Sequence, residues 1–512
     1  MNTTLPILDL VVLCLYIIAV VAFGCWFVRK SGTSSEFMIA GGSIPGWAVG
    51  LSIFGTYLSS NTFLGVPGKA YGGNWNAFVF SLSLPIAAWI AVKYFVPFYR
   101  RSGTMSAYQN MEIRFGPWAR TYAATCYLLT QIARMGAIMF GVAIGLRALT
   151  GWDLSSIILL TGVLVTLYTL LGGIEAVIWT DVTQSIVLMI GALVVLAVLL
   201  FDHPDGASGS IQFAAQNGKF SLGSFSPDLT TSTFWVVMLY GLFINLNNFG
   251  IDQSYIQRYH TTPSESAAKR SVMFGALLYV PVSLVFFLIG SLLFSYYHAH
   301  PDMLAEVTAQ VAAQSGRAAS ELGAADIGDK ILPHFMTHAL PAGVGGLIIA
   351  AIFAAAMSSV DTSLNSSATV ILCDFYQPYI NPDADEKTRM KVLRMATVLW
   401  GIIGTAVALF MIGAASVLDI WWKLSGLFAG GMLGLFLLGL ISRKANNAAA
   451  ITGVITGVLI LIWVALSPES ALPKNLQSPF HANMAIVIGT LSIFLVGLLV
   501  SRFTQNKAPA RP

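Results

Sequence analysis

The strongest constraint on this chain is the length of its apolar segments. Along all 512 residues, runs of roughly 20 mostly apolar residues alternate with short polar loops, and a run of that length spans the hydrocarbon core of a bilayer as a helix. Composition agrees, because 56% of the residues are hydrophobic and only 10% are charged. A soluble domain carries about 25% charged residues. The sequence therefore predicts an all-α polytopic membrane protein.

Hydropathy and the distribution of charge together predict a topology. About thirteen transmembrane helices are expected. They lie at 6–28, 45–70, 75–99, 117–147, 154–171, 176–201, 232–256, 271–297, 340–372, 392–413, 417–440, 446–466 and 482–501. Most of the 27 Lys and Arg fall in alternate loops, Arg120 and Arg258 among them, and loops of that kind face the cytoplasm. The N-terminus and the polar loops 202–231 and 298–339 are therefore expected outside, and the C-terminus inside.

Span 45–70 is polar at its centre, where the bilayer is driest. The run from Gly55 to Thr62 reads GTYLSSNT. Backbone that leaves the helix at this depth is tolerated where it lines a cavity, and it frees carbonyl oxygens for a cation and N–H groups for a polar solute. The alternative is an unbroken helix whose hydroxyls bond back to the preceding turn or pack against a neighbour. We favour a broken helix.

Span 340–372 carries a second polar set. Ala355, Ser358, Ser359 and Thr362 follow i, i+3, i+4 and i+7 and therefore share one helical face. One carbonyl and three hydroxyls are hard oxygen ligands, and their neutral character favours a monovalent cation. Asp361 adds a carboxylate, which is costly inside a membrane and is therefore a candidate functional group.

Three further polar features lie within the spans. Asp181 is about one turn into span 176–201, where it is either functional or a helix-start aspartate favoured by the helix dipole. Arg134 is midway along span 117–147 and needs a partner: Asp181, a set of carbonyls, water or an anionic substrate. Span 232–256 contains Asn245, Asn247 and Asn248, which predict another bent or cavity-lining segment.

His334 and His338 stand four residues apart in loop 298–339, a spacing that can hold zinc on one helical face. No Glu lies between them and no third ligand is evident in the sequence. We therefore interpret the pair as part of a plain surface helix.

The sequence contains no nucleotide-driven machinery. The P-loop pattern G-x-x-x-x-G-K-[ST] is absent, and so are a soluble ATPase domain and an interfacial catalytic cluster. A broken helix, a hydroxyl-rich helix and scarce membrane acids favour transport driven by an ion gradient over an enzyme. An ion channel and a solute sensor remain the alternatives from other classes.

Four stretches of the chain resemble the sodium:solute symporter family: Phe54–Phe63, Gly172–Asp181, Asp252–Arg258 and Ala351–Asn365. The resemblance implies the leucine-transporter architecture of two inverted five-helix repeats, here 45–201 and 232–440. Residues 1–44 would add one helix before them and 441–512 two helices and a cytoplasmic tail. Segment 202–231 would be an extracellular loop, and 298–339 an extracellular insertion.

The resemblance also implies where the coupling ions bind. The main sodium site would use the carbonyls of Gly55, Leu58 and Ala355 with the hydroxyls of Ser358 and Ser359. A second cation site would lie at Asp181, Ser358, Asp361 and Thr362. This chain departs from the family there, because Asp361 replaces a hydroxyl residue. The second site is therefore expected to bind sodium more strongly, to favour a proton, or to leave Asp361 as a structural partner.

For the substrate, the family's sialic acid carriers have an arginine at the position of Arg134, which pairs with the sugar carboxylate, and hydroxyls matching Ser59, Ser60 and Thr62. Tyr57 stands where they have a threonine, and Asn245 matches a sugar-binding asparagine of a neutral-sugar carrier. The resemblance implies sodium-coupled uptake of a carboxylated sugar such as sialic acid, with a neutral hexose or another organic anion as alternatives. It implies no enzyme activity, no cofactor besides sodium ions, no nucleic-acid or obligate protein partner, and a bacterial inner-membrane location.

Overall fold

The computed structural model describes residues 6–58, 60–341, 343–413, 415–469 and 472–504. Within these ranges the chain is helical, without β-strands. The first half contains α1 (Ile7–Trp26), α2 (Ser34–Ile39), α3 (Gly46–Tyr57), α4 (Ser60–Gly72), α5 (Val79–Ile90), α6 (Val96–Ser102), α7 (Gln109–Phe115), α8 (Pro117–Thr150), α9 (Leu154–Phe201) and α10 (Gly206–Gln216).

The second half is also built from helices joined by short connections. It contains α11 (Phe234–Ile251), α12 (Gln253–His260), α13 (Glu265–Ala299), α14 (Pro301–Ser315), α15 (Ala324–His338), α16 (Val344–Val370), α17 (Gln377–Tyr379), α18 (Glu386–Phe410), α19 (Ala415–Ile441), α20 (Asn447–Leu466) and α21 (Met484–Phe503).

Ten of the described helices are long and apolar enough to cross a membrane, or up to eleven if α2 and α3, which meet at a bend of 113°, form one span. The predicted count of thirteen is not confirmed. Span 45–70 is divided between the short helices α3 and α4, and span 417–440 lies in α19, of which only Phe428–Ile441 is counted, as a shorter apolar helix. Spans 154–171 and 176–201 both lie within α9, on either side of a kink at Gly173.

Gly173 makes the kink between the two predicted spans within α9. It is the only residue of α9 with non-helical backbone angles, φ 57° and ψ −152°, a conformation open to glycine and costly for residues with a Cβ. A Cβ at this position would also lie 2.9 Å from the backbone of Phe37. A single glycine therefore makes the corner for which the sequence predicted a loop.

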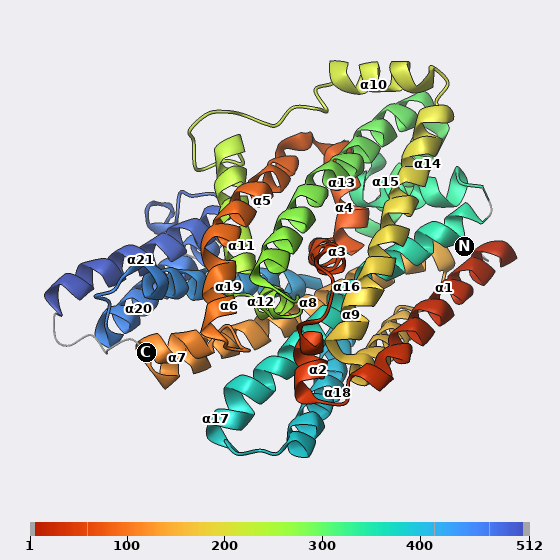
Figure 1. Cartoon of the computed structure of the whole chain (residues 1–512). Coiled ribbons are helices and arrows are strands. Elements are labelled where there is room, and N and C mark those ends of the chain that lie inside the picture. The colour runs from red at the N-terminus through yellow and green to blue at the C-terminus, as the bar shows by residue number, and fades with distance from the viewer. Residues whose placement is uncertain (1–5, 59, 342, 414, 470–471, 505–512) are drawn as a thin grey trace.

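The helix α16 forms the centre of the molecule. Its residues from Ile348 to Val370 are all buried, and it packs against α1, α8, α9 and α18 (Figure 1). A helix that is buried on every side has no lipid-facing stripe, so its polar residues face other helices. The hydroxyl-rich segment at 355–362 is thus held inside protein.

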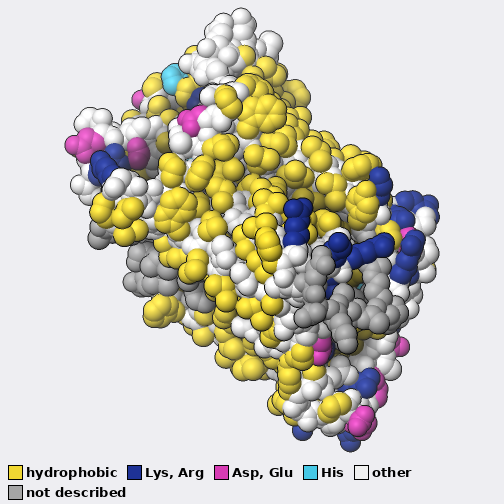
Figure 2. Space-filling model, turned by 90° about the vertical axis from the view of Figure 1, so that its left-hand side faces the viewer, with side chains coloured by type: hydrophobic (Ala, Val, Ile, Leu, Met, Phe, Trp, Pro, Cys, Tyr) yellow, Lys and Arg dark blue, Asp and Glu magenta, His cyan; other side chains and the backbone are white. Residues whose placement is uncertain are grey.

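The ends of the molecule are built from short helices and loops. Helices α10 and α15 lie toward one end, and α2 and α17 lie at the opposite end (Figure 1). Between the ends, hydrophobic side chains form a broad band across the surface, and most charged side chains gather beyond it (Figure 2). This distribution is that of an integral membrane protein.

Candidate functional site

The helix predicted at 45–70 is interrupted at the polar run. Helix α3 ends at Tyr57, and Leu58 is extended, with φ −84° and ψ 117°, before α4 begins at Ser60. The predicted break is confirmed. The alternative of hydroxyls bonding back to the helix also occurs, because Thr56 Oγ1 donates to the Ser52 carbonyl at 2.8 Å.

A second break separates α11 from α12. Asp252 has φ −78° and ψ 119°, nearly the angles of Leu58, and its side chain accepts a hydrogen bond from Ser254 N at 2.8 Å. The three asparagines of the predicted 232–256 span precede this break, so the expectation of a bent segment is confirmed. The chain therefore contains two interrupted helices, α3–α4 and α11–α12, whose breaks have nearly the same backbone conformation.

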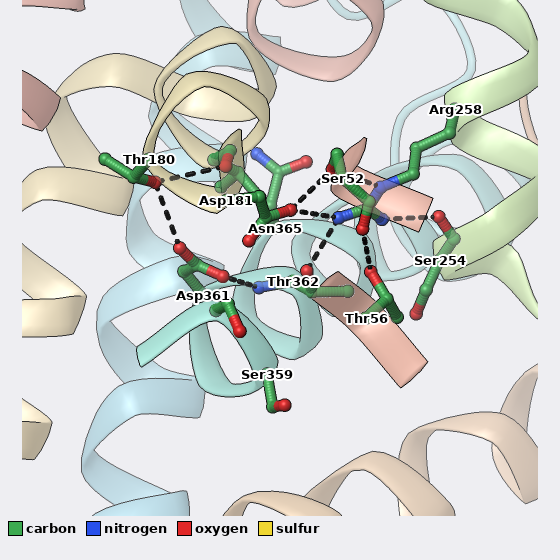
Figure 3. Close-up of polar contacts among 12 residues, drawn as sticks. Ser52, Thr56, Thr180, Asp181, Ser254, Arg258, Ser359, Asp361, Thr362 and Asn365 are labelled. Carbon is green, nitrogen blue, oxygen red and sulfur yellow. Dashed lines mark hydrogen bonds and ion pairs between the residues drawn. The ribbon is translucent and has the colours of Figure 1, made fainter. Parts of the chain in front are cut away.

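The predicted main cation site lies where α16 meets the first broken helix. Helices α3 and α4 both contact α16, and Gly55, Leu58 and Ala355 are all buried. On α16, the hydroxyls of Ser358 and Ser359 each donate to the carbonyl of Ala355, at 3.2 Å (Figure 3 shows Ser359). The two hydroxyls are thus held by their own helix.

Arg258 is the centre of the polar network in this region. Its Nη2 lies 2.9 Å from Asp181 Oδ2 and donates to Thr362 Oγ1 at 2.7 Å, and its Nε donates to Ser52 Oγ at 2.8 Å (Figure 3). The arginine side chain is 1% exposed and that of Asp181 is 0% exposed. The guanidinium therefore ties α12 to α3, α9 and α16 at once.

Asp361 lies beside this network with donors of its own. Its Oδ2 accepts from Tyr168 Oη at 2.6 Å and from Thr180 Oγ1 at 3.4 Å, and its Oδ1 accepts from Thr362 N at 2.6 Å. Asp181 Oδ1 is buried and has no hydrogen-bond partner among the described residues. Asp181 is thus paired with the guanidinium, whereas Asp361 is held by hydroxyl and backbone donors beside the pair.

Arg134 is half-buried and reaches the broken helix. Its Nη2 donates to the carbonyl of Thr56 at 2.8 Å, next to the end of α3. Within the part of the chain that the structure describes, Arg134 forms no ion pair, and Asp181 is paired with Arg258 instead. Of the partners considered from the sequence, the structure thus gives Arg134 a carbonyl.

The remaining predicted substrate residues are placed to different degrees. The ring of Tyr57 packs with Phe249, Tyr255 and Tyr279 at centroid distances of 5.1–5.8 Å, directly beside the break. Asn245 is buried, donates to Ser83 Oγ at 3.1 Å, and has no partner for its Oδ1 among the described residues. Ser59 and the side chain of Ser60 lie outside the described residues. Thr62 follows in α4.

Arg258 was assigned to a cytoplasmic loop in the sequence interpretation, and that assignment is wrong. So is that of Arg120, which is 7% exposed and bonds Asp374 Oδ1 at 2.7 Å and Glu112 Oε2 at 2.5 Å. Arg258 follows an apolar segment and Arg120 begins one, and a positive charge at either place is the pattern of an inner-loop residue. The structure shows why Arg258 is buried: it lies on α12, a short helix whose residues are all buried although most are polar.

Two interrupted helices, a central buried helix and buried charges among apolar spans define an integral membrane protein with a polar site inside its helix bundle. The family model of the sodium:solute symporter family matches residues 37–457. The chain therefore belongs to the sodium:solute symporter family, whose members are transporters.

Individual relatives agree with the family. The sodium/sialic acid symporter NanT of Aliivibrio fischeri is 34% identical over 507 residues, which cover 98% of this chain and 94% of the relative. A solved structure of a Na⁺-coupled sialic acid symporter, in a substrate-bound outward-open state, superposes with a TM-score of 0.87 at 30% identity over 98% of this chain and 99% of that chain.

The fold extends to more distant proteins. The nucleobase-cation-symport-1 transporter Mhp1 superposes with a TM-score of 0.56 at 15% identity, covering 92% of this chain and 95% of that one. This similarity concerns the fold alone. It supports the predicted leucine-transporter type of architecture.

Proposed function

We propose that this chain is a symporter that couples inward sodium flux to the uptake of a carboxylated sugar, with sialic acid as the substrate. The sodium/sialic acid symporter NanT and the solved Na⁺-coupled sialic acid symporter each match 98% of this chain. The observation that carries the proposal is Arg134: its guanidinium is anchored by one hydrogen bond to the end of α3 and forms no ion pair among the described residues. A bidentate pair with a sugar carboxylate suits such a guanidinium.

Sodium would bind between α3 and α16, at the carbonyls of Gly55, Leu58 and Ala355 and the hydroxyls of Ser358 and Ser359. The extended backbone at Leu58 supports this, because a residue outside the helical hydrogen-bond pattern can direct its carbonyl toward an ion. Sodium would join the two elements and favour the outward-facing state. Substrate would then bind against Arg134 and the hydroxyls of the break, after which the outer gate closes and the inner gate opens.

The second cation site at Asp181, Ser358, Asp361 and Thr362 would work with the Arg258 guanidinium as a permanent counter-charge. Asp181 is paired with Arg258, and Asp361 forms no ion pair among the described residues, so its carboxyl is the group that would take up the added cation. The unpartnered Oδ1 of Asp181 supports a place for one more cation there, either sodium or a proton.

The two repeats would run from 45 to 201 and from 232 to 440, each opened by a broken helix. The matching backbone angles at Leu58 and Asp252 support this division. The N-terminus would lie outside and the C-terminus inside, with 202–231 and 298–339 on the outer side.

A neutral hexose is the second candidate substrate. Asn245 supports it, since its buried amide oxygen has no partner among the described residues and would accept a hydrogen bond from a sugar hydroxyl.

The test is uptake of radiolabelled sialic acid by proteoliposomes with an inward sodium gradient, compared with choline medium at the same pH and voltage. Accumulation in sodium alone is expected. Equal accumulation in choline would overturn sodium coupling, and accumulation of galactose but not of sialic acid would support the second candidate. Conductance without accumulation of any solute would instead support a channel.

A further inference from the structure

Three metal-binding side chains come together outside the transport site, on the hairpin formed by α14 and α15. Glu306 on α14 lies opposite His334 and His338 on α15, and one ligand atom from each residue lies within 4.8 Å of the other two. The two imidazoles stack with centroids 4.1 Å apart. The structure thus places a third candidate ligand, which the sequence did not reveal, beside the two histidines.

The hydrogen bonds of the imidazoles leave the same nitrogen of each ring available. His334 Nδ1 lies 2.7 Å from Tyr297 Oη, whose hydroxyl points to the Ile331 carbonyl, and His338 Nδ1 lies 2.9 Å from the His334 carbonyl. His338 Nδ1 faces a carbonyl, which only accepts, so this nitrogen carries the proton and Nε2 carries the lone pair. His334 has the same form when Tyr297 Oη donates to the Ile331 carbonyl and accepts from Nδ1. A second-shell bond of this kind orients a histidine for metal binding.

Both free nitrogens face the Glu306 carboxylate. His334 Nε2 lies 3.7 Å from Glu306 Oε2, and His338 Nε2 lies 3.5 Å from Oε1. These separations are too long for hydrogen bonds. They are close to the spacing of about 3.3 Å between neighbouring ligands around a tetrahedral zinc ion with bonds near 2.0–2.1 Å.

His334 provides an independent indication of a ligand. The residue is 5% exposed, and its Nε2 is a buried polar atom without a hydrogen-bond partner among the described residues.

We propose that Glu306, His334 and His338 form a Zn²⁺ site that fastens α14 to α15. Two imidazoles and a carboxylate are a common three-ligand zinc set, and the fourth position is open to water because Glu306 and His338 are exposed. Side chains from both helices are needed, so the ion closes the hairpin.

Zinc at this position would also restrain the contact between α15 and the broken helix. Helix α15 packs along α4, and the two backbones approach so closely at Gly68 and Gly328 that a Cβ on Gly68 would lie 2.9 Å from the Gly328 backbone. The hairpin fastened by zinc therefore rests directly on the outer half of the broken helix.

The test is direct titration of the full-length protein, purified without a histidine tag and stripped with chelator, with Zn²⁺ alone. One Zn²⁺ per chain and a rise in Tm are expected. Glu306→Gln, His334→Gln and His338→Gln should each weaken zinc binding by roughly 10- to 100-fold or more. Tyr297→Phe should weaken it about tenfold, because only the orienting hydroxyl is lost.

The matched control is His481→Gln, the same substitution in the loop before α21, which should leave zinc binding unchanged. Each variant is first compared with the parent by Tm without zinc, so that a loss of fold is distinguished from a loss of the site. Absence of binding in the parent, or equal affinity in His334→Gln, His338→Gln and His481→Gln, would overturn the proposal. Neither result depends on transport, so the site and the proposed function fail separately.

Discussion

Arg134 and Arg258 are both charged groups inside the helix bundle, but their surroundings differ. Arg258 is 1% exposed and is bonded to a carboxylate, two hydroxyls and a carbonyl. Arg134 is half-buried and bonds one carbonyl. A guanidinium has five N–H donors. The N–H donors of Arg258 are therefore used by protein groups, whereas Arg134 has N–H donors left for a solute.

Replacing Arg134 should therefore affect substrate affinity. Arg134→Ala should raise the KM for a carboxylated sugar by roughly 10- to 100-fold, since a hydrogen-bonded charge contributes about 1.5–3 kcal/mol. The KM of Arg134→Lys should lie between those of the parent and of Arg134→Ala, because lysine keeps the charge and loses the bidentate geometry. Uptake kinetics in proteoliposomes measure both variants. An unchanged KM in Arg134→Ala would refute the pairing with a carboxylate.

Ser359→Ala should weaken sodium activation of uptake. Loss of one oxygen ligand is expected to raise the half-saturating sodium concentration roughly tenfold, the equivalent of about 1.4 kcal/mol. Ser363→Ala is the control, because Ser363 lies one turn further along α16 and its hydroxyl donates to the Ser359 carbonyl at 2.9 Å. If the two variants have the same half-saturating sodium concentration, the assignment of Ser359 as a sodium ligand is wrong.

The buried pair of Arg258 and Asp181 should show strong coupling in stability. Arg258→Met leaves Asp181 without its counter-charge, which is expected to cost about 3–5 kcal/mol and to lower Tm. The double variant Arg258→Met, Asp181→Leu should recover most of that loss. Thermal unfolding of the two single variants and the double variant measures the coupling, and additive losses would contradict it.

At the scale of elements, the sequence predicted the interruption in 45–70 because its polar run is out of place in a membrane span. It predicted the second interruption from the asparagines before Asp252. It predicted a loop between spans 154–171 and 176–201 but not that Gly173 alone makes the turn, because the backbone angles of one glycine leave no trace in hydropathy. Helix α12 was also missed as a buried element, since eight mostly polar residues are too short and too polar to be recognised as core.

The close contact of α4 with α15 leads to a test on one helix. Gly68→Ala should destabilise the protein by about 1–3 kcal/mol through overpacking, because the added Cβ would meet the Gly328 backbone at 2.9 Å. Gly65→Ala, three residues earlier on α4, meets no atom within 4 Å and should be neutral or slightly stabilising. The measurement is the Tm of the two variants in thermal unfolding. Equal Tm values would rule out a tight contact at Gly68.

For the whole molecule, the sequence predicted the membrane class, the all-helical fold and the family. These follow from composition, span length and motifs that extend over most of the chain. The polar network was only partly predictable. Asp181, Thr362 and Ser52 come from three separate helices, and nothing along the chain indicates that Arg258 joins them. Long-range pairing of this kind is visible only after folding.

The proposed orientation can be tested with single cysteines. In a variant without Cys14, Cys25, Cys126 and Cys373, a membrane-impermeant maleimide should label Gln314→Cys, on exposed α14, in right-side-out vesicles. Lys387→Cys, exposed at the start of α18, should be labelled only in inside-out vesicles. The parent without cysteines should remain unlabelled. The reverse pattern would invert the topology.

The Arg258 guanidinium also limits how the transporter can rearrange. A fully desolvated ion pair is costly to separate, so the segments that carry its two partners should travel as one body during the cycle. Helix α12, which carries Arg258, would then move together with α9, which carries Asp181. Helices should move relative to one another at other contacts, which are apolar and easily exchanged.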